Sequence, residues 1–206
     1  IPLIKGPYVS RPAASVVREV LALAGQGVRE IVLISHDTTG FGRDRGVEDG
    51  LAKLLEDLAR VEGPSWLRFL YGYPEDVSDR LLEAMSGPKV CRYFDIPFQH
   101  ADPRLVKAMR RGLDGDKALR LLDRIRAKLP GAAFRTSLIV GFPGEGRREF
   151  GALRRFVAAA RFDHLGVFGY SPERGTPAFA LGDPVPAAVK EERLREIMEL
   201  QAGISK

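Results

Sequence analysis

The sequence predicts a single α/β domain whose strands run parallel and form a partial barrel of strand-helix units. Five short runs rich in Val, Ile, Leu and Phe alternate with amphipathic segments of helical period. The runs recur roughly every thirty residues, the spacing of parallel βα units. The 206 residues are enough for one domain with a sizeable core and too few for two of ordinary size. An open doubly wound sheet is the alternative architecture.

The expected elements follow one another in regular order. A helix over 13–24 comes first, introduced by Pro12, whose missing N–H costs nothing in a first turn. We expect strands at 31–35, 67–73, 92–98, 134–141 and 164–170. Helices are expected at 49–61, 77–86, 103–128 with a break at 112–115, and 147–160, and a final helix follows Pro186.

A βα series that opens on a helix lacks its first strand. Residues 1–12, IPLIKGPYVSRP, have the composition of the end of a strand-to-helix loop. We therefore expect at least one further strand and the start of that loop before Ile1. With six strands, right-handed crossovers would close the sheet into a partial (β/α)6 barrel.

Composition and charge indicate the class of partner and the cellular compartment, but they do not indicate the reaction. Thirty-two Lys and Arg against 27 Asp and Glu give a net charge of +5, which suits a nucleic-acid or ribosomal partner and equally an ordinary solvated surface. The sequence has no long apolar run, so we expect no membrane association. Cys91 is the only cysteine, so these residues complete no disulfide, zinc site or cluster, and we expect Cys91 in the core and the protein in the reducing cytoplasm.

Ligands of parallel βα folds bind at the carboxyl ends of the strands. Here those ends are rich in glycine and polar residues, over 35–42, 71–76, 97–102, 141–146 and 170–178. In the fourth strand Phe134, Leu138 and Val140 share one face, and Arg135 shares the other with Ser137 and Ile139. An arginine facing a barrel interior needs a partner. Either Arg135 (or Arg68) pairs with Asp95, or Arg135 binds the carboxylate of a zwitterionic ligand.

Several chemistries compete for these strand ends. The turn GFPGE at 141–145 lets backbone groups approach a ligand closely, although a purely structural tight turn explains it equally well. His36, Asp37, His100 and Glu145 could converge on a metal ion of a hydrolase, but the sequence has no HxH pair or HExxH helix. Asp76 with Glu145 would be a glycosidase pair. No serine occupies a nucleophile elbow, and Cys91 opens its strand at the wrong end.

Four segments in order resemble one family: ISHDTTGFG (34–42), DIPFQHADPRLVKAMRRG (95–112), FRTSLIVGFPGE (134–145) and GYSPERGTPA (169–178). They are similar to the core motifs of the radical S-adenosylmethionine methylthiotransferases, and the resemblance extends over nearly the whole chain. It implies S-adenosylmethionine and 4Fe-4S clusters as cofactors, with the three cluster cysteines expected upstream of Ile1. It also implies a 5′-deoxyadenosyl radical and transfer of a methylthio group, with the protein supplying binding and orientation.

The resemblance implies a cofactor-binding set but assigns no catalytic residue. The adenine would lie along the fourth strand and its turn, at Ile139, Val140, Gly141, Phe142, Pro143 and Glu145. Gln99 and His100 would lie near the ribose, and Arg135 near the methionyl carboxylate. Asp37 and Thr38 would face the amino group or the substrate, and Tyr170 completes the set.

Two branches of the family differ in substrate. One modifies an aspartate of a small-subunit ribosomal protein, and the other an adenosine in transfer RNA. The SHDT and QH segments favour the first branch, with transfer RNA as the alternative partner, and an electron donor such as flavodoxin is implied. Residues 1–206 would then be the core domain alone, inactive without the N-terminal methylthiotransferase domain, the cysteine loop and the C-terminal domain. A scaffold or degenerate homologue without a cluster is the remaining hypothesis.

Three departures from the family pattern stand out. His36 occupies a position where Gln is usual, Lys5 one where Arg is common, and Gly146 one where Thr is expected.

Overall fold

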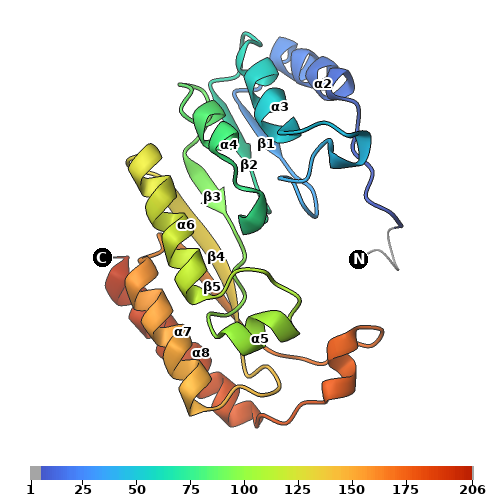
Figure 1. Cartoon of the computed structure of the whole chain (residues 1–206). Helices are drawn as coiled ribbons and strands as arrows, with labels where there is room; N and C mark the ends of the chain where they lie inside the picture. Colours follow the sequence, from blue (N-terminus) through green and yellow to red (C-terminus); the bar gives the residue numbers. More distant parts are fainter. Residues whose placement is uncertain (1–5, 206) are drawn as a thin grey trace. The chain divides into compact units, whose positions relative to one another are not determined.

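A computed structural model describes residues 6–205 and divides the chain into two compact units (Figure 1). Unit 1 comprises Ile1–Phe94 with Lys128–Ala132, and unit 2 comprises Asp95–Ala127 with Ala133–Lys206. Within residues 6–205, no helix is both long enough and apolar enough to cross a membrane.

Unit 1 is built on two parallel strands. Its elements in order are α2 (Ala13–Gly25), β1 (Glu30–Leu33), α3 (Gly50–Ala59), β2 (Trp66–Phe69) and α4 (Asp79–Ala84). β1 and β2 pair in register from Glu30–Trp66 to Leu33–Phe69. Helix α3 turns its leucines inward, because Leu51, Leu54 and Leu58 recur at helical spacing, and all three are buried.

Unit 2 is built on a three-stranded sheet and on helices that pack against it. β4 (Ala133–Val140) pairs in parallel with β5 (His164–Gly169), and β3 (Tyr93–Asp95), at the boundary of the units, completes the order β3-β4-β5. α5 (Pro103–Ala108) and α6 (Gly115–Lys128) precede β4. α7 (Arg147–Ala160) and α8 (Ala187–Ile204) pack side by side, with α8 against β5 (Figure 1).

The core of unit 2 follows the alternation predicted for the fourth strand. Phe134, Leu138 and Val140 are buried, together with Thr136, whose hydroxyl donates to the Ile96 carbonyl at 2.8 Å. Below this face, rings from the segment after β3, from α7 and from the segment before β5 meet at centroid distances of 5.6–6.0 Å: Phe98, Phe156 and Phe162. Burying such rings drives folding of this unit.

The predicted elements are present, but the sheet is shorter than expected. All five strands are confirmed, although they span only three to eight residues. The helix break predicted at 112–115 is present, but it begins earlier, because α5 ends at Ala108 and α6 begins at Gly115. The strands form two sheets, β1-β2 and β3-β4-β5. Among residues 6–205, the bridge that β2 makes beyond its ladder with β1 is the one from Leu67 to Val90, which precedes β3. β3 itself pairs with β4. The parallel α/β class is therefore confirmed, and the partial barrel stays a prediction.

Cys91 differs from the prediction of a core residue. Its side chain is only half-buried, beside the bridge between Leu67 and Val90. Partial burial raises the pKa of the Cys91 thiol, and the nearby guanidinium of Arg68 opposes this. The segment runs beside β2, where the Cys91 N–H donates to the Leu67 carbonyl at 2.8 Å, and Cys91 precedes the first residue of β3.

Candidate functional site

The turn after β4 is shaped by two glycines in left-handed conformation. Gly141 has φ of 76° and Gly144 has φ of 92°. A Cβ on Gly141 would lie 2.4 Å from Cγ of Lys190, so only glycine allows α8 to approach this closely. The buried Lys190 ammonium donates to the Tyr170 carbonyl at 2.7 Å and pairs with Asp183. Through Lys190, helix α8 thus contacts the residues that directly follow β4 and β5 and holds them in place.

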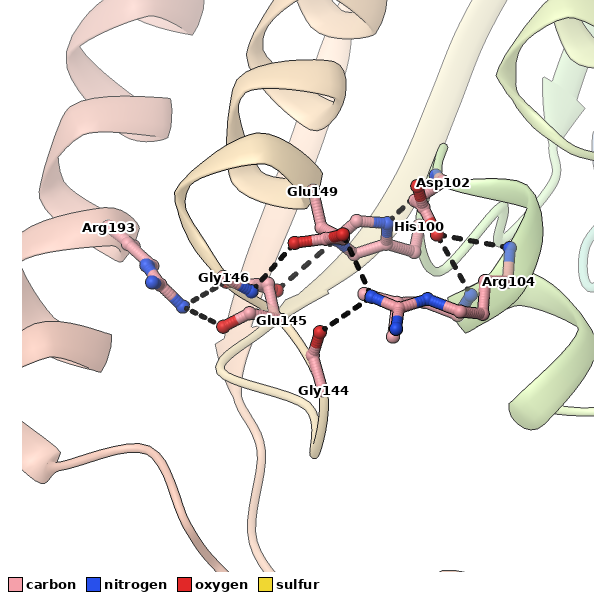
Figure 2. Close-up of polar contacts among 9 residues, drawn as sticks. His100, Asp102, Arg104, Gly144, Glu145, Gly146, Glu149 and Arg193 are labelled. Carbon is pink, nitrogen blue, oxygen red and sulfur yellow. Dashed lines mark hydrogen bonds and ion pairs between the residues drawn. The ribbon is translucent and has the colours of Figure 1, made fainter.

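A buried carboxylate lies at the end of this turn (Figure 2). Glu145 Oε1 is 2.6 Å from Nη1 of Arg193, and Oε2 is 3.2 Å from Nε2 of His100. The Glu145 and His100 side chains are 0% exposed, and that of Arg193 is 11% exposed. Arg193 also donates to the Glu145 carbonyl at 3.1 Å. A charge this deeply buried is tolerable only with a close, hydrogen-bonded counter-charge.

The hydrogen bonds of His100 define its tautomer. Its Nδ1 accepts the backbone N–H of Asp102 at 3.0 Å, so this nitrogen carries no proton. The ring proton is therefore on Nε2, which donates it to Glu145. Neutral His100 leaves one anion and one cation in the set, and we call Glu145, Arg193 and His100 the buried triad. It joins the segments after β3 and β4 to α8.

A second set of contacts holds the turn from α5. Asp102 caps α5 by accepting the N–H groups of Arg104 and Leu105 at 3.0 and 3.1 Å. Arg104 then donates to the Gly144 carbonyl at 3.2 Å and to Glu149 at 2.8 Å (Figure 2). The capping side chain Asp102 thereby positions the arginine that ties α5 to the turn.

Glu149 stabilises the start of α7. Because Gly146 has no side chain to cap the helix, Glu149 at the third helical position accepts the Gly146 N–H at 3.0 Å. Hydrogen bonds from its own backbone N–H and from Gly146, together with Arg148, lower the pKa of Glu149 to about 2, against an opposing effect of burial. Since the folded pKa is depressed, this stabilisation is present above the ordinary pKa of 4.5 and is lost as pH falls through about 2.

A cavity of about 550 Å³ opens at the carboxyl ends of β4 and β5. Its lining is mainly apolar and aromatic, with Ile139, Phe142 and Tyr170 among the residues that form it, and Gln99 contributes one of its few polar groups. Phe142 and Tyr170 pack edge to face at 5.1 Å, and both pack with Leu105. Tyr170 Oη donates to the Ala178 carbonyl at 2.9 Å, which fixes the loop after β5. This volume and composition are typical of small-molecule sites.

The predicted cofactor-binding residues of unit 2 fall into four groups. Gln99, Ile139, Phe142 and Tyr170 line the cavity. Gly141, Pro143, Glu145 and His100 form or support the turn beside it, and Val140 is buried with the core face. Arg135 lies in the first half of β4, 46% exposed, with Nη1 at 3.5 Å from Asp95. The ion pair offered as the alternative role of Arg135 is present, and its contact with a ligand stays a prediction.

Asp37 and Thr38 lie in unit 1, after β1. The Asp37 carboxylate accepts the Thr39 hydroxyl and the Gly40 N–H, both at 2.9 Å, and lies 3.6 Å from Arg43. The Thr38 hydroxyl donates to the Leu70 carbonyl at 2.6 Å. Both side chains therefore build the strand-end turn here, and the ligand contacts predicted for them stay predictions.

The rival chemistries find little support in residues 6–205. That part of the chain contains no group of three His, Cys, Asp or Glu side chains placed to hold a metal ion. His100 and Glu145 bind each other, and Asp76 pairs with Arg43 at 2.5 Å. These side chains already have protein partners.

The sequence did not single out Lys190, Arg193 or Arg104. Each is one of many charged residues on helices, which are normally solvated. A weak signal was present, since Lys190 and Arg193 are three residues apart and so share a face of α8. The Asp102-Pro103 pair was a readable helix start.

The superfamily of the chain follows from its similarity to known proteins. Residues 3–157 match the family model described as "Radical SAM superfamily". The chain belongs to the radical SAM superfamily. This radical SAM chain spans about half the length of the curated relatives it matches. It is 48% identical over 207 residues to "Ribosomal protein uS12 methylthiotransferase RimO" of Aquifex aeolicus, covering 100% of this chain and 48% of that protein. The Koribacter versatilis protein of the same name is also 48% identical, with 41% of its length covered.

Solved structures share the radical SAM fold at low sequence identity. Coproporphyrinogen III oxidase (HemN) from Escherichia coli aligns with a TM-score of 0.64 and 15% identity over 93% of this chain and 45% of that one. The radical S-adenosylmethionine methyltransferase TsrM from Kitasatospora setae aligns with a TM-score of 0.63 and 18% identity, over 80% of this chain and 30% of that one.

Proposed function

We propose that this chain is the S-adenosylmethionine-binding core of a methylthiotransferase that modifies an aspartate of ribosomal protein uS12. The observation that carries the proposal is the 550 Å³ cavity, lined by motif residues at the carboxyl ends of β4 and β5. Full-length coverage of the chain by relatives named uS12 methylthiotransferases supports the substrate. The basic balance of +5 is compatible with a protein presented beside ribosomal RNA, and the reaction belongs in the cytoplasm.

The residues of the cavity fit S-adenosylmethionine. Ile139, Phe142 and Tyr170 offer apolar and aromatic surface for the adenine, and the Gln99 amide offers a donor and an acceptor for the ribose hydroxyls. The buried triad and Lys190 hold the turn and the loop in place, so the cavity is preorganised. When bound, the cofactor would supply the radical chemistry that removes a hydrogen atom from the substrate.

The residues of this chain do not fit an iron–sulfur cluster. A cluster needs three or four thiolates, and the sequence contains one cysteine, Cys91, in unit 1. We propose that the cluster ligands lie on the remainder of the protein, that an electron donor such as flavodoxin reduces it, and that the 206-residue chain alone is inactive.

The substrate assignment is tested by the product. We expect the full-length protein to convert an aspartate of a uS12 peptide to methylthio-aspartate, with transfer RNA unmodified in a parallel assay. Mass spectrometry of both substrates measures the result. Modified transfer RNA with an unchanged peptide would contradict the substrate, and modification of neither would contradict the proposed reaction.

The proposed contact of Arg135 with the methionyl carboxylate makes a separate prediction. Arg135→Met in the full-length protein is expected to weaken S-adenosylmethionine binding by about 1.5–3 kcal/mol, the range for a hydrogen bond to a charged group. Titration calorimetry measures the affinity. Arg68→Met, which removes a strand arginine paired with Glu30 at 2.8 Å, is the control and should leave affinity unchanged. Unchanged affinity in a folded Arg135→Met protein would restrict Arg135 to its ion pair with Asp95.

A further inference from the structure

The chain end of α5 contains an arginine in a conformation that favours glycine. Arg110 has φ of 56°. Its N–H donates to the Lys107 carbonyl at 3.0 Å, and the N–H of Arg111 donates to the Val106 carbonyl at 2.9 Å. These two bonds form a Schellman motif, whose left-handed position is usually glycine because a Cβ is strained there. A glycine at 110 would therefore cap α5 better than the arginine does.

The strained arginine lies at the cavity. Five non-glycine residues of the described chain have positive φ, and two of them, Gln99 at 68° and Arg110, line the same cavity. Within residues 6–205 the exposed Arg110 guanidinium makes no hydrogen bond or ion pair, so no contact inside this part of the chain explains why arginine occupies the position. The Schellman motif accounts for the positive φ but not for an arginine in that position, and strained non-glycine residues cluster at ligand-binding sites.

The charges of the lining indicate what the guanidinium would bind. Arg110 and Arg111 line the cavity with a single carboxylate, Glu173. A guanidinium presents a planar fork of donors that matches a carboxylate. We propose that Arg110 is a specificity-determining residue that binds a carboxylate of a ligand entering this cavity. The inference rests on the proposed function, which offers two such groups: the methionyl carboxylate and the side chain of the target aspartate.

Arg161 provides a matched control. It ends α7, has φ of 47°, is exposed, and is not part of the cavity lining. Arg110→Gly and Arg161→Gly in the full-length protein should each relieve left-handed strain and raise Tm slightly, by about 2–4 °C if the gain resembles that of other favourable glycine caps. Only Arg110→Gly should lower affinity for a carboxylate ligand, more than tenfold, and Arg110→Lys should recover part of it because the charge remains without the fork.

Two binding experiments separate the sources of the carboxylate. Calorimetry with S-adenosylmethionine, and with a uS12 peptide containing the target aspartate or asparagine in its place, is run on all variants. Lower S-adenosylmethionine affinity in Arg110→Gly alone supports the methionyl carboxylate. Unchanged S-adenosylmethionine affinity with loss confined to the aspartate peptide supports the substrate carboxylate. Unchanged affinity for both ligands, or equal loss for both peptides, overturns the proposal. A wild-type protein that binds no uS12 peptide would instead contradict the proposed substrate, and the S-adenosylmethionine titration then decides the role of Arg110.

Discussion

Glu145→Ala is expected to destabilise unit 2 by about 3–5 kcal/mol, the cost of removing one partner from a buried ion pair. The change leaves the Arg193 guanidinium buried without its counter-charge at 2.6 Å and the Nε2–H of His100 without its acceptor at 3.2 Å. Denaturant unfolding, followed by a probe in unit 2, measures the free energy of unfolding.

A matched surface pair serves as control for Glu145. Glu196 is 2.8 Å from Arg154, and their side chains are 37% and 52% exposed. Glu196→Ala should cost about 0–1 kcal/mol, because water screens this pair. Glu145→Gln keeps the shape and one of the two acceptor oxygens but removes the charge, so its cost should lie between those of the two alanine variants. Equal, small losses for Glu145→Ala and Glu196→Ala would contradict the role given to the buried triad.

Gly50→Ala is expected to destabilise unit 1 by about 3 kcal/mol, the upper part of the usual range for overpacking. A Cβ on Gly50 would lie 2.0 Å from the carbonyl oxygen of Phe41 and 3.0 Å from its carbonyl carbon. Both are backbone atoms, so relief requires movement of the loop between β1 and α3. Helix propensity alone would predict the opposite sign, since alanine favours a helix by about 1 kcal/mol over glycine.

Gly203→Ala separates the two effects. Gly203 lies in α8, and a Cβ there would meet no atom within 4 Å. This variant should gain about 0.5–1 kcal/mol from helix propensity. Thermal and denaturant unfolding of both variants measure the difference. Stabilisation by both substitutions would show that the loop at Phe41 yields easily to the added methyl group.

Local sequence patterns were sufficient to predict the helices and strands and several of the segments that line the cavity. The alternation in 134–141 predicted which side chains of β4 are buried, and the carboxyl-end rule selected the segments that contain Gln99, Phe142 and Tyr170, which the family resemblance then singled out. The partner of Glu145 could not be predicted, because Arg193 is 48 residues further along. Its spacing from Lys190 shows only that the two share a face of α8, and not that this face turns inward. Barrel closure was likewise beyond local patterns, since pairing between distant strands depends on the assembled chain.

The contacts of α8 limit which segments of two related proteins can be joined into one working chimera. The superfamily match ends at residue 157, yet Lys190 and Arg193 come from a helix beyond it and support the turn beside the cavity. A chimera could join residues up to 157 of one relative to the following segment of another. Its turn after β4 and its helix α8 would then come from different proteins, and their contacting residues need not match. In such chimeras, both residues of the pair Gly141–Lys190, and both of the pair Glu145–Arg193, should come from the same parent, although the two residues of each pair lie far apart in sequence.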